Sequence, residues 1–333
     1  MPAQEPGRHP DRDPRRAPPA GRGTQRRAPC LQPDKEVGTI HDIPDPDAAP
    51  ADDAVRTSSA PPRTGGPLMT ASPFTLAACA EMVYLDLPFV ERVERIAARG
   101  LQVEMWNWNA PDKDLTALAA TGADIGSMTG YLTGDLVTDT GRHDFLESAR
   151  ASIEVAHTLG VGRLNFHGTG LGDQGLPVAP VEHVTGAMWA RATLTLQELA
   201  RLGADASVVF TMENLNLPVD HPGTPFSHPD DTRALVSAID SPALRMNLDL
   251  YHAQIGDGQL IETCRQCLPW IGEIQVADVP GRCEPGTGEI NYPRIAVALQ
   301  QMGYTGVVAM EAWASGDPDR ALDAFIDAFT PAG

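Results

Sequence analysis

From residue 74 onward, the chain alternates short β-rich runs with longer amphipathic helical patterns, and it does so eight times. The expected strands are residues 75–80, 101–106, 123–128, 163–168, 207–214, 244–250, 273–278 and 306–311. Helical patterns follow at 88–100, 112–120, 143–159, 182–202, 230–240, 258–268, 292–302 and 318–329. Eight strand and helix pairs in about 260 residues predict an α/β fold, a closed (β/α)8 TIM barrel.

A doubly wound open sheet is the alternative fold for such an alternation. That fold usually carries a glycine-rich loop after its first strand. Here the first strand is followed by EMVYLDLP, which contains no glycine. The sequence therefore favours the closed barrel.

The N-terminal segment differs in composition from the rest of the chain. Its first 67 residues hold 14 of the 30 prolines and almost no apolar run, so they cannot bury enough surface to offset chain entropy. We expect a disordered extension at 1–70 and one barrel domain at 71–333. Met69 leads directly into the first strand, which raises the hypothesis that it, rather than Met1, is the natural start.

The extension also lacks the apolar centre of a secretory signal and carries too many acids for a transit peptide, so we expect a cytoplasmic protein. It contains 10 of the 25 basic and 10 of the 44 acidic residues, so the barrel carries the whole net charge of −19. Such a surface argues against nucleic acid as a partner, and no apolar run is long enough to span a bilayer. The expected partner is a small molecule, with homo-oligomerisation left open.

Five cysteines form an odd set without a secretory context, which argues against a disulfide framework. Cys264 and Cys267 make a CxxC motif, which redox proteins and zinc sites also use. No second pair follows it, and the motif lies within an amphipathic helical pattern. Core packing is the favoured interpretation.

Four side chains able to bind a metal end four successive expected strands: Glu213, Asp249, Gln275 and Glu311. Equivalent strand ends of a parallel barrel meet around one mouth, so these side chains are expected to converge. Two glutamates, an aspartate and an amide oxygen suit Mg2+ or Mn2+ better than zinc. Any one of them alone is equally well explained as a loop residue or helix cap, but four in consecutive units are harder to explain that way.

Several other chemistries lack the residues that they need. Lys113, the only lysine after the extension, lies in a loop expected to be solvated, which argues against Schiff-base catalysis. No GxSxG nucleophile motif is present. The GTGLGDQG segment lies too late in the chain for a dinucleotide fingerprint and is interpreted as a flexible loop at the active site.

Carboxylate and metal chemistry remains. Glu213 and Glu311 would approach the mouth from separate directions, where one removes a proton from a sugar-like substrate and the same or the other returns it. Proton return to the neighbouring carbon is aldose–ketose isomerisation, and return to the same carbon on the opposite face is epimerisation.

Four further residues are candidates for substrate binding: His252, Arg282, His167 and Trp106. An arginine on the loop that follows Gln275 suits a bidentate grip on a carboxylate. Each candidate also has a structural interpretation, as a hydrogen-bonding or packing histidine, a surface ion pair, or a core aromatic. Glu104, inside the second strand, is equally well explained as a residue that supports the site.

The stretches NLDLYHAQIGDGQL and IGEIQVADVPGRCEPGTGEINYP resemble the hydroxypyruvate isomerase family, within the xylose-isomerase-like sugar isomerases and epimerases. The resemblance is specific over 207–312 and fainter near the first helix. It implies a TIM barrel, with Glu213 and Glu311 as proton donor and acceptor. It also implies a divalent metal held by these two with Asp249 and Gln275, and His252 and Arg282 near the substrate.

The resemblance makes a metal-dependent isomerase the leading hypothesis, interconverting hydroxypyruvate and tartronate semialdehyde (2-hydroxy-3-oxopropanoate) or a close relative. A ketose or keto-acid 3-epimerase with the same site is the first alternative. A non-catalytic sugar-binding barrel would not need both glutamates, and a metal-dependent nuclease would need more histidine ligands and a basic groove. The MWNW and HGTGLGDQG segments depart from a typical member, so the sequence indicates the reaction type better than the substrate.

Overall fold

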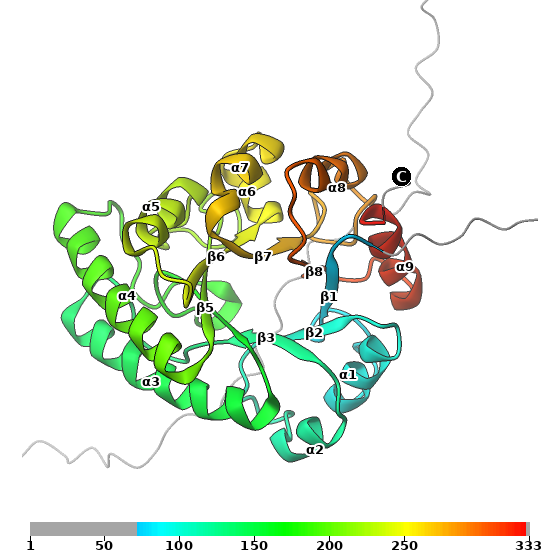
Figure 1. Cartoon of the computed structure of the whole chain (residues 1–333), viewed down its shortest axis with the longest axis horizontal. Helices are drawn as coiled ribbons and strands as arrows, with labels where there is room; N and C mark the ends of the chain where they lie inside the picture. The colour runs from blue at the N-terminus through cyan, green and yellow to red at the C-terminus, as the bar shows by residue number, and fades with distance from the viewer. Residues whose placement is uncertain (1–71, 331–333) are drawn as a thin grey trace, which may run out of the picture.

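The eight expected strands pair in sequence order and close on themselves. The computed structural model describes residues 72–330, within which all strands are parallel and β1 pairs with β8 as well as with β2. Figure 1 shows the ring of strands surrounded by helices. The predicted (β/α)8 barrel is confirmed, while the expected extension at 1–70 lies outside the described residues.

The strands lie close to their predicted positions, because their apolar residues are buried against the surrounding helices. They are β1 (Thr75–Cys79), β2 (Gln102–Met105), β3 (Ile125–Thr129), β4 (Arg163–Phe166), β5 (Val209–Glu213), β6 (Leu244–Asp249), β7 (Ile271–Val276) and β8 (Val307–Met310).

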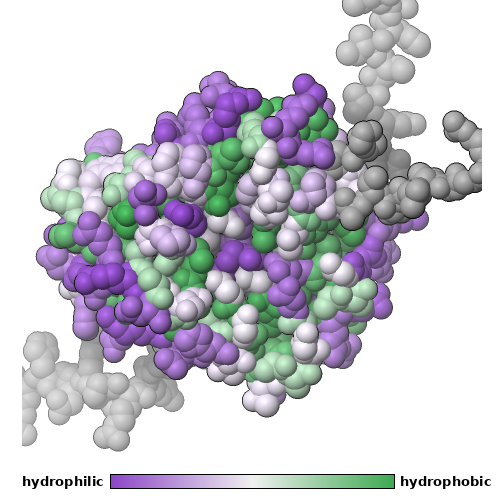
Figure 2. Space-filling view, viewed as in Figure 1, coloured by the Kyte–Doolittle hydropathy of each residue, from purple (hydrophilic) through white to green (hydrophobic). Residues whose placement is uncertain are grey.

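The helices cover the outside of the barrel and turn their polar faces to solvent, so the outer rim in Figure 2 is mostly hydrophilic. They are α1 (Phe89–Ala97), α2 (Leu115–Ala120), α3 (Asp139–Leu159), α4 (Gly186–Ala206), α5 (Pro229–Ile239), α6 (Leu250–Gly256), α7 (Leu260–Cys267), α8 (Tyr292–Gln301) and α9 (Pro318–Ala328), with 3-10 turns η1 (Asp173–Gly175) and η2 (Leu268–Trp270). None of the described helices is long and apolar enough to cross a membrane.

One helix was not expected from the sequence. Helix α6 starts directly after β6, because the Asp249 side chain accepts a hydrogen bond from the His252 backbone N–H at 2.7 Å and caps the new helix. The strand-end carboxylate is therefore also an N-cap. It places His252 in the first turn of α6, where the side chain lines the cavity at the barrel mouth.

A buried polar cluster fills the barrel one layer toward the N-terminal ends of the strands. Glu273 of β7 is fully buried and accepts hydrogen bonds from Ser127, Thr211 and the Arg163 guanidinium. Because each of these side chains comes from a different strand, the cluster links strands across the barrel and supports the floor below the site.

Candidate active site

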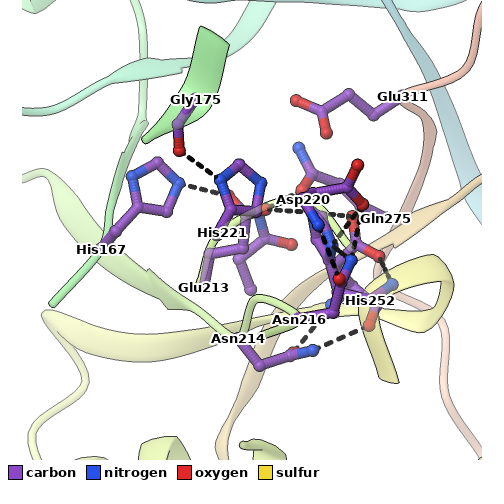
Figure 3. A network of polar contacts seen from close by, with 12 residues as sticks. His167, Gly175, Glu213, Asn214, Asn216, Asp220, His221, His252, Gln275 and Glu311 are labelled. Carbon is purple, nitrogen blue, oxygen red and sulfur yellow. Dashed lines mark hydrogen bonds and ion pairs between the residues drawn. The ribbon is translucent and has the colours of Figure 1, made fainter. Parts of the chain in front are cut away.

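The four predicted strand-end residues lie at the same mouth of the barrel. Glu213 and Asp249 are the last residues of β5 and β6, Gln275 is next to last in β7, and Glu311 directly follows β8. Asp249 and Gln275 are register partners, and all four side chains are buried. Figure 3 shows the surrounding polar network.

A cavity of about 160 Å³ opens at this mouth, and six of the eight predicted site residues line it: Trp106, His167, Glu213, His252, Arg282 and Glu311. Asp249 and Gln275 are not in its lining and lie buried at the same strand ends. The cavity wall also includes Gly170, Leu171 and Gly172 of the GTGLGDQG segment. The predicted placement of that loop at the mouth is therefore correct.

The Glu213 carboxylate faces Asn165, which lies in β4, and His167, which directly follows that strand. Its Oε2 accepts a hydrogen bond from the Asn165 amide and lies 3.0 Å from His167 Nε2. Burial by itself would raise the pKa of this carboxyl, but His167 and the Asn165 hydrogen bond outweigh it and the pKa is lowered.

His167 is held on its other side by Tyr131. The Tyr131 hydroxyl donates to the Thr169 carbonyl at 2.7 Å, so its oxygen is left to accept from His167 Nδ1 at 3.0 Å. With Nδ1 carrying a hydrogen, one further proton must lie between His167 Nε2 and the Glu213 carboxylate for that contact to be a hydrogen bond. His167 and Glu213 therefore act as a pair.

The environment of His252 determines which ring nitrogen carries its proton. The Asn216 amide oxygen accepts from the backbone N–H groups of Val219 and Asp220, so the amide nitrogen is the atom 2.7 Å from His252 Nδ1. Nδ1 is therefore an acceptor, and in the neutral ring the hydrogen lies on Nε2. Burial lowers the pKa of His252 well below its usual value and keeps the ring neutral.

His252 Nε2 has no hydrogen-bond partner among the described residues and is aimed into the site. It lies 3.8 Å from Glu213 Oε1 and 4.0 Å from Asp249 Oδ2. An N–H group at this position can donate to a substrate oxygen, whereas a metal ligand would need a lone pair there. The geometry favours a donor role for His252.

Glu311 is held by two donors. Trp106 Nε1 donates to its Oε1 at 2.6 Å, and the Arg282 guanidinium pairs with its Oε2. Burial raises the pKa of Glu311 to about 7, although Arg282 opposes the shift. The guanidinium also lies over the Tyr251 ring, 5.1 Å from its centroid, and its Nε has no partner among residues 72–330.

The amide of Gln275 is also fixed in orientation. Its Nε2 donates to Glu104 Oε2 at 3.1 Å, and its Oε1 accepts from the Asn247 amide at 2.7 Å. Glu104 is itself buried, and burial raises its pKa well above the usual value. Glu104 thus supports the site from β2 without lining the cavity.

The donors at the mouth fit a divalent cation. One carboxylate oxygen each from Glu213 and Asp249 lies within 4.8 Å of the other and of a His252 ring nitrogen, which in the tautomer set by Asn216 is a donor and not a ligand. Burial and the neighbouring Glu213 raise the pKa of Asp249 well above its usual value, because like charges are crowded in a poorly solvated space. A cation would relieve that crowding, and the carboxylate oxygens are ligands of the hard kind that Mg2+ and Mn2+ prefer.

Sequence reasoning missed His221, which lies in the loop between β5 and α5 and lines the cavity. Its Nδ1 donates to the Gly175 carbonyl at 2.7 Å, and burial lowers its pKa to about 4. Gly175 has a φ of 74°, a conformation that glycine adopts readily, and this turns its carbonyl toward the ring. The loop sequence carries no strand-end pattern that would have marked this histidine.

The prediction that Lys113 is solvated is wrong. Its side chain is only 3% exposed, pairs with Glu81, and lies 4.6 Å from the centroid of the Phe89 ring. The buried ion pair still argues against Schiff-base catalysis by Lys113, because an ammonium bound to a carboxylate is a poor nucleophile. Lys113 also does not line the cavity.

The CxxC motif lies on α7, and neither of its cysteines lines the cavity. Cys264 and Cys267 are free, buried thiols on α7, and they pack in the hydrophobic core. Burial raises the pKa of both thiols to about 12, which disfavours the reactive thiolate. The interpretation of this CxxC as core packing is confirmed.

A family model described as the xylose isomerase-like TIM barrel matches residues 90–330. A hydroxypyruvate isomerase from Escherichia coli is 36% identical over 243 residues, covering 69% of this chain and 90% of that protein. A 2-oxo-tetronate isomerase from Haemophilus influenzae is 27% identical over 255 residues, covering 75% of this chain and 97% of that protein.

Other matches are partial or structural. A Homo sapiens protein named "Putative hydroxypyruvate isomerase" is 31% identical over 54% of this chain, and the aligned region spans only 63% of that protein. The crystal structure of an AP endonuclease, family 2, from Brucella melitensis superposes with a TM-score of 0.65 and 24% identity, over 76% of this chain and 98% of that one. At that identity the match shows a shared fold alone.

Proposed function

Because this chain belongs to the xylose isomerase-like TIM barrel family, we propose that it is an isomerase that moves a proton between adjacent carbons of a small hydroxy-keto acid. The proposed substrate is hydroxypyruvate, which would be converted to tartronate semialdehyde. The observation that carries the proposal is a pair of buried carboxylates, Glu213 and Glu311, whose pKa values are shifted in opposite directions at one cavity. Such pairs are typical of acid–base catalysis.

Of the two proposed proton-transfer groups, Glu311 is the one whose pKa lies near neutral pH. A carboxyl with a pKa of about 7 exchanges a proton readily near neutral pH, which is what removal and return of a carbon-bound proton requires. Glu213, with its lowered pKa and its bond to His167, is the proposed second group. In hydroxypyruvate, C3 would lose a proton to one carboxylate and C2 would receive a proton from the same or the other carboxyl.

The oxygens of the substrate must exchange a proton as well, since the C3 hydroxyl becomes a carbonyl and the C2 carbonyl becomes a hydroxyl. His252 Nε2–H is aimed into the site and would hydrogen-bond to a substrate oxygen as charge develops on it. Arg282 is the proposed partner of the substrate carboxylate, because its Nε has no partner within residues 72–330. Trp106 and His167 would complete the wall around the substrate.

Glu213, Asp249, Gln275 and Glu311 are the proposed ligands of a divalent cation, Mg2+ or Mn2+. When bound, such a cation would polarise the substrate carbonyl and stabilise the negative charge of an enediolate. The proposal is supported by the crowded buried carboxylates and by the fixed amide of Gln275. His252 is not among the proposed ligands, because its Nε2–H would donate a hydrogen bond to the substrate.

A four-carbon substrate is the second candidate. The relative named 2-oxo-tetronate isomerase aligns over 97% of its length, and that name describes the same type of proton shift on a longer hydroxy-keto acid. Epimerisation would use the same carboxylates and return the proton to the same carbon. A cytoplasmic location and the oligomeric state remain predictions.

The proposed function is tested by incubating Mn2+- or Mg2+-loaded protein with hydroxypyruvate, 2-oxo-tetronate and ketoses in D2O and following the products by NMR. Deuterium at C2 of tartronate semialdehyde is expected, with turnover abolished by a chelator and restored by metal. Glu311→Gln should lower turnover by about 10² to 10⁴, whereas the exposed Glu289→Gln should retain it. Deuterium incorporation only at the original carbon of a ketose would instead establish an epimerase.

A further inference from the structure

The buried lysine forms part of a chain of contacts that ends at the active site. Lys113 pairs with Glu81 Oε1, and the same oxygen accepts the Trp106 backbone N–H at 2.9 Å. The Trp106 indole then donates to Glu311 Oε1 at 2.6 Å. Four residues from separate parts of the chain are thus connected by three contacts.

The location of these residues explains why the contacts form. Glu81 lies just after β1 and Trp106 just after β2, and Lys113 comes from the segment before α2. Strands β1 and β2 are neighbours in the barrel (Figure 1). The Trp106 N–H lies beyond the last hydrogen bonds of its strand and would need another acceptor. Glu81 supplies that acceptor and so fixes the backbone from which the indole projects.

The charge on Lys113 is needed for this arrangement. The Glu81 side chain is 14% exposed, and a carboxylate in such a place requires an opposite charge or strong hydrogen bonds. Within residues 72–330, the only donor to Glu81 besides Lys113 and the Trp106 N–H is the Cys79 thiol, a weak donor at 3.4 Å. Without the ammonium, Glu81 would turn toward solvent and release the Trp106 backbone.

We propose that Glu81 and Lys113 are positioning residues for Glu311, acting through Trp106. The inference rests on the proposed role of Glu311 in proton transfer. Glu311 is held between two donors, the indole on Oε1 and Arg282 on Oε2. Loss of the indole contact would let the carboxylate turn toward Arg282 and away from the substrate proton.

The experiment uses the full-length, metal-loaded protein and the variant Lys113→Met. We expect kcat to fall about tenfold with KM within twofold, as when a group is misplaced in the transition state alone. Lys113→Arg should restore most of kcat, because it keeps the charge. A Lys113→Met variant with unchanged kcat would overturn the proposal.

A double-mutant cycle distinguishes positioning from general stability. Trp106→Phe keeps an aromatic ring but removes the indole N–H, so Lys113→Met should have no further effect on kcat in that background. If Lys113→Met lowers kcat by the same factor with and without the indole N–H, the chain of contacts does not transmit its effect. Melting temperatures are measured alongside to confirm that each variant is folded.

Should Lys113→Met fail to fold, the double variant Glu81→Ala/Lys113→Met removes both charges together and leaves neither unpaired. It also removes the acceptor for the Trp106 N–H, so the same loss of kcat is expected. A folded double variant with the kcat of the parent protein would contradict the proposal.

A spectroscopic measurement tests the contact without any substrate. The Trp106 indole N–H resonance is assigned in a 1H–15N spectrum by its loss in Trp106→Phe. We expect it far downfield in the parent protein and shifted upfield in Lys113→Met, as the bond to Glu311 lengthens. An unmoved resonance would contradict the inference, whereas absence of isomerase activity with a shifted resonance would count against the proposed function only.

Discussion

The Asn216 amide nitrogen lies 2.7 Å from His252 Nδ1, and this contact places the imidazole hydrogen on the nitrogen that faces the active site. Asn216→Asp would replace the donor with an acceptor, so the hydrogen would move to Nδ1 and leave a lone pair on Nε2. We expect turnover to fall by about 10- to 100-fold, since the substrate oxygen loses its donor.

The tautomer itself can be observed. Histidine side-chain 15N shifts should identify Nε2 of His252 as the protonated nitrogen in the parent protein and Nδ1 in Asn216→Asp. Asn216→Ala is the matched variant, because it removes the donor without adding a carboxylate. An Asn216→Asp protein that keeps both the parent tautomer and the parent turnover would contradict the assigned role of His252.

The stability of the metal-free protein should depend on pH through Glu311. Its folded-state pKa is raised to about 7 from an ordinary value of 4.5, so between these values the folded state binds more protons than the unfolded state. The free energy of unfolding contributed by this group is therefore highest below pH 4.5 and declines as the pH rises through 7. The free energy of unfolding of Glu311→Gln, relative to that of the parent protein, should therefore be larger at pH 8 than at pH 5.

Urea denaturation of both proteins at the two pH values, in the presence of chelator, measures this difference. Glu289→Gln controls for loss of an exposed charge. If the stability difference between Glu311→Gln and the parent protein is the same at pH 5 and pH 8, the raised pKa is not present in the folded protein.

The fold could be predicted from the sequence because each strand and helix shows its own periodicity over a few residues. The four strand-end residues could be predicted for a related reason, since parallel strands in a barrel present equivalent ends at one mouth. The sequence left open whether Asp249 binds a metal, begins a loop or caps a helix, and the structure shows that it caps α6 and places His252 in the first turn of that helix.

The contacts that tune the site could not be predicted from the sequence, because they join loops that are distant along the chain. Lys113 and Glu81 are 32 residues apart, and His221 meets Gly175 across 46 residues. A loop lysine carries no sequence pattern that distinguishes a buried ion pair from a solvated side chain, and the Lys113–Glu81 pair appears only once the barrel has closed. The tautomer of His252 likewise depends on Asn216, 36 positions before it.

Glu104 should affect metal binding although it does not line the cavity. It accepts the Gln275 amide hydrogen at 3.1 Å and so directs the amide oxygen away from β2. Glu104→Leu would release that amide, and we expect Mn2+ affinity to fall about 10- to 100-fold, as for other residues that orient metal ligands. Titration calorimetry measures the change, with the exposed Glu94→Leu as control, and an unaltered affinity would count against Gln275 as a ligand.

Arg282 should distinguish acidic from neutral substrates. Its guanidinium faces the cavity, and its Nε has no partner in the described part of the chain, so a substrate carboxylate could use it in addition to Glu311. Arg282→Ala should raise KM for hydroxypyruvate by at least about tenfold. Arg282→Lys should recover only part of this, because lysine keeps the charge but cannot form the paired hydrogen bonds.

The same variant also changes the acid–base behaviour of the site. Arg282 opposes the effect of burial on Glu311, so its removal should raise the pKa of that carboxyl above its value of about 7. The acidic limb of the kcat profile should then move to higher pH, and it should move less in Arg282→Lys. Steady-state kinetics from pH 5.5 to 9 measure both effects, and an unchanged KM for hydroxypyruvate with an unmoved limb would indicate that Arg282 contacts neither the substrate nor Glu311 during turnover.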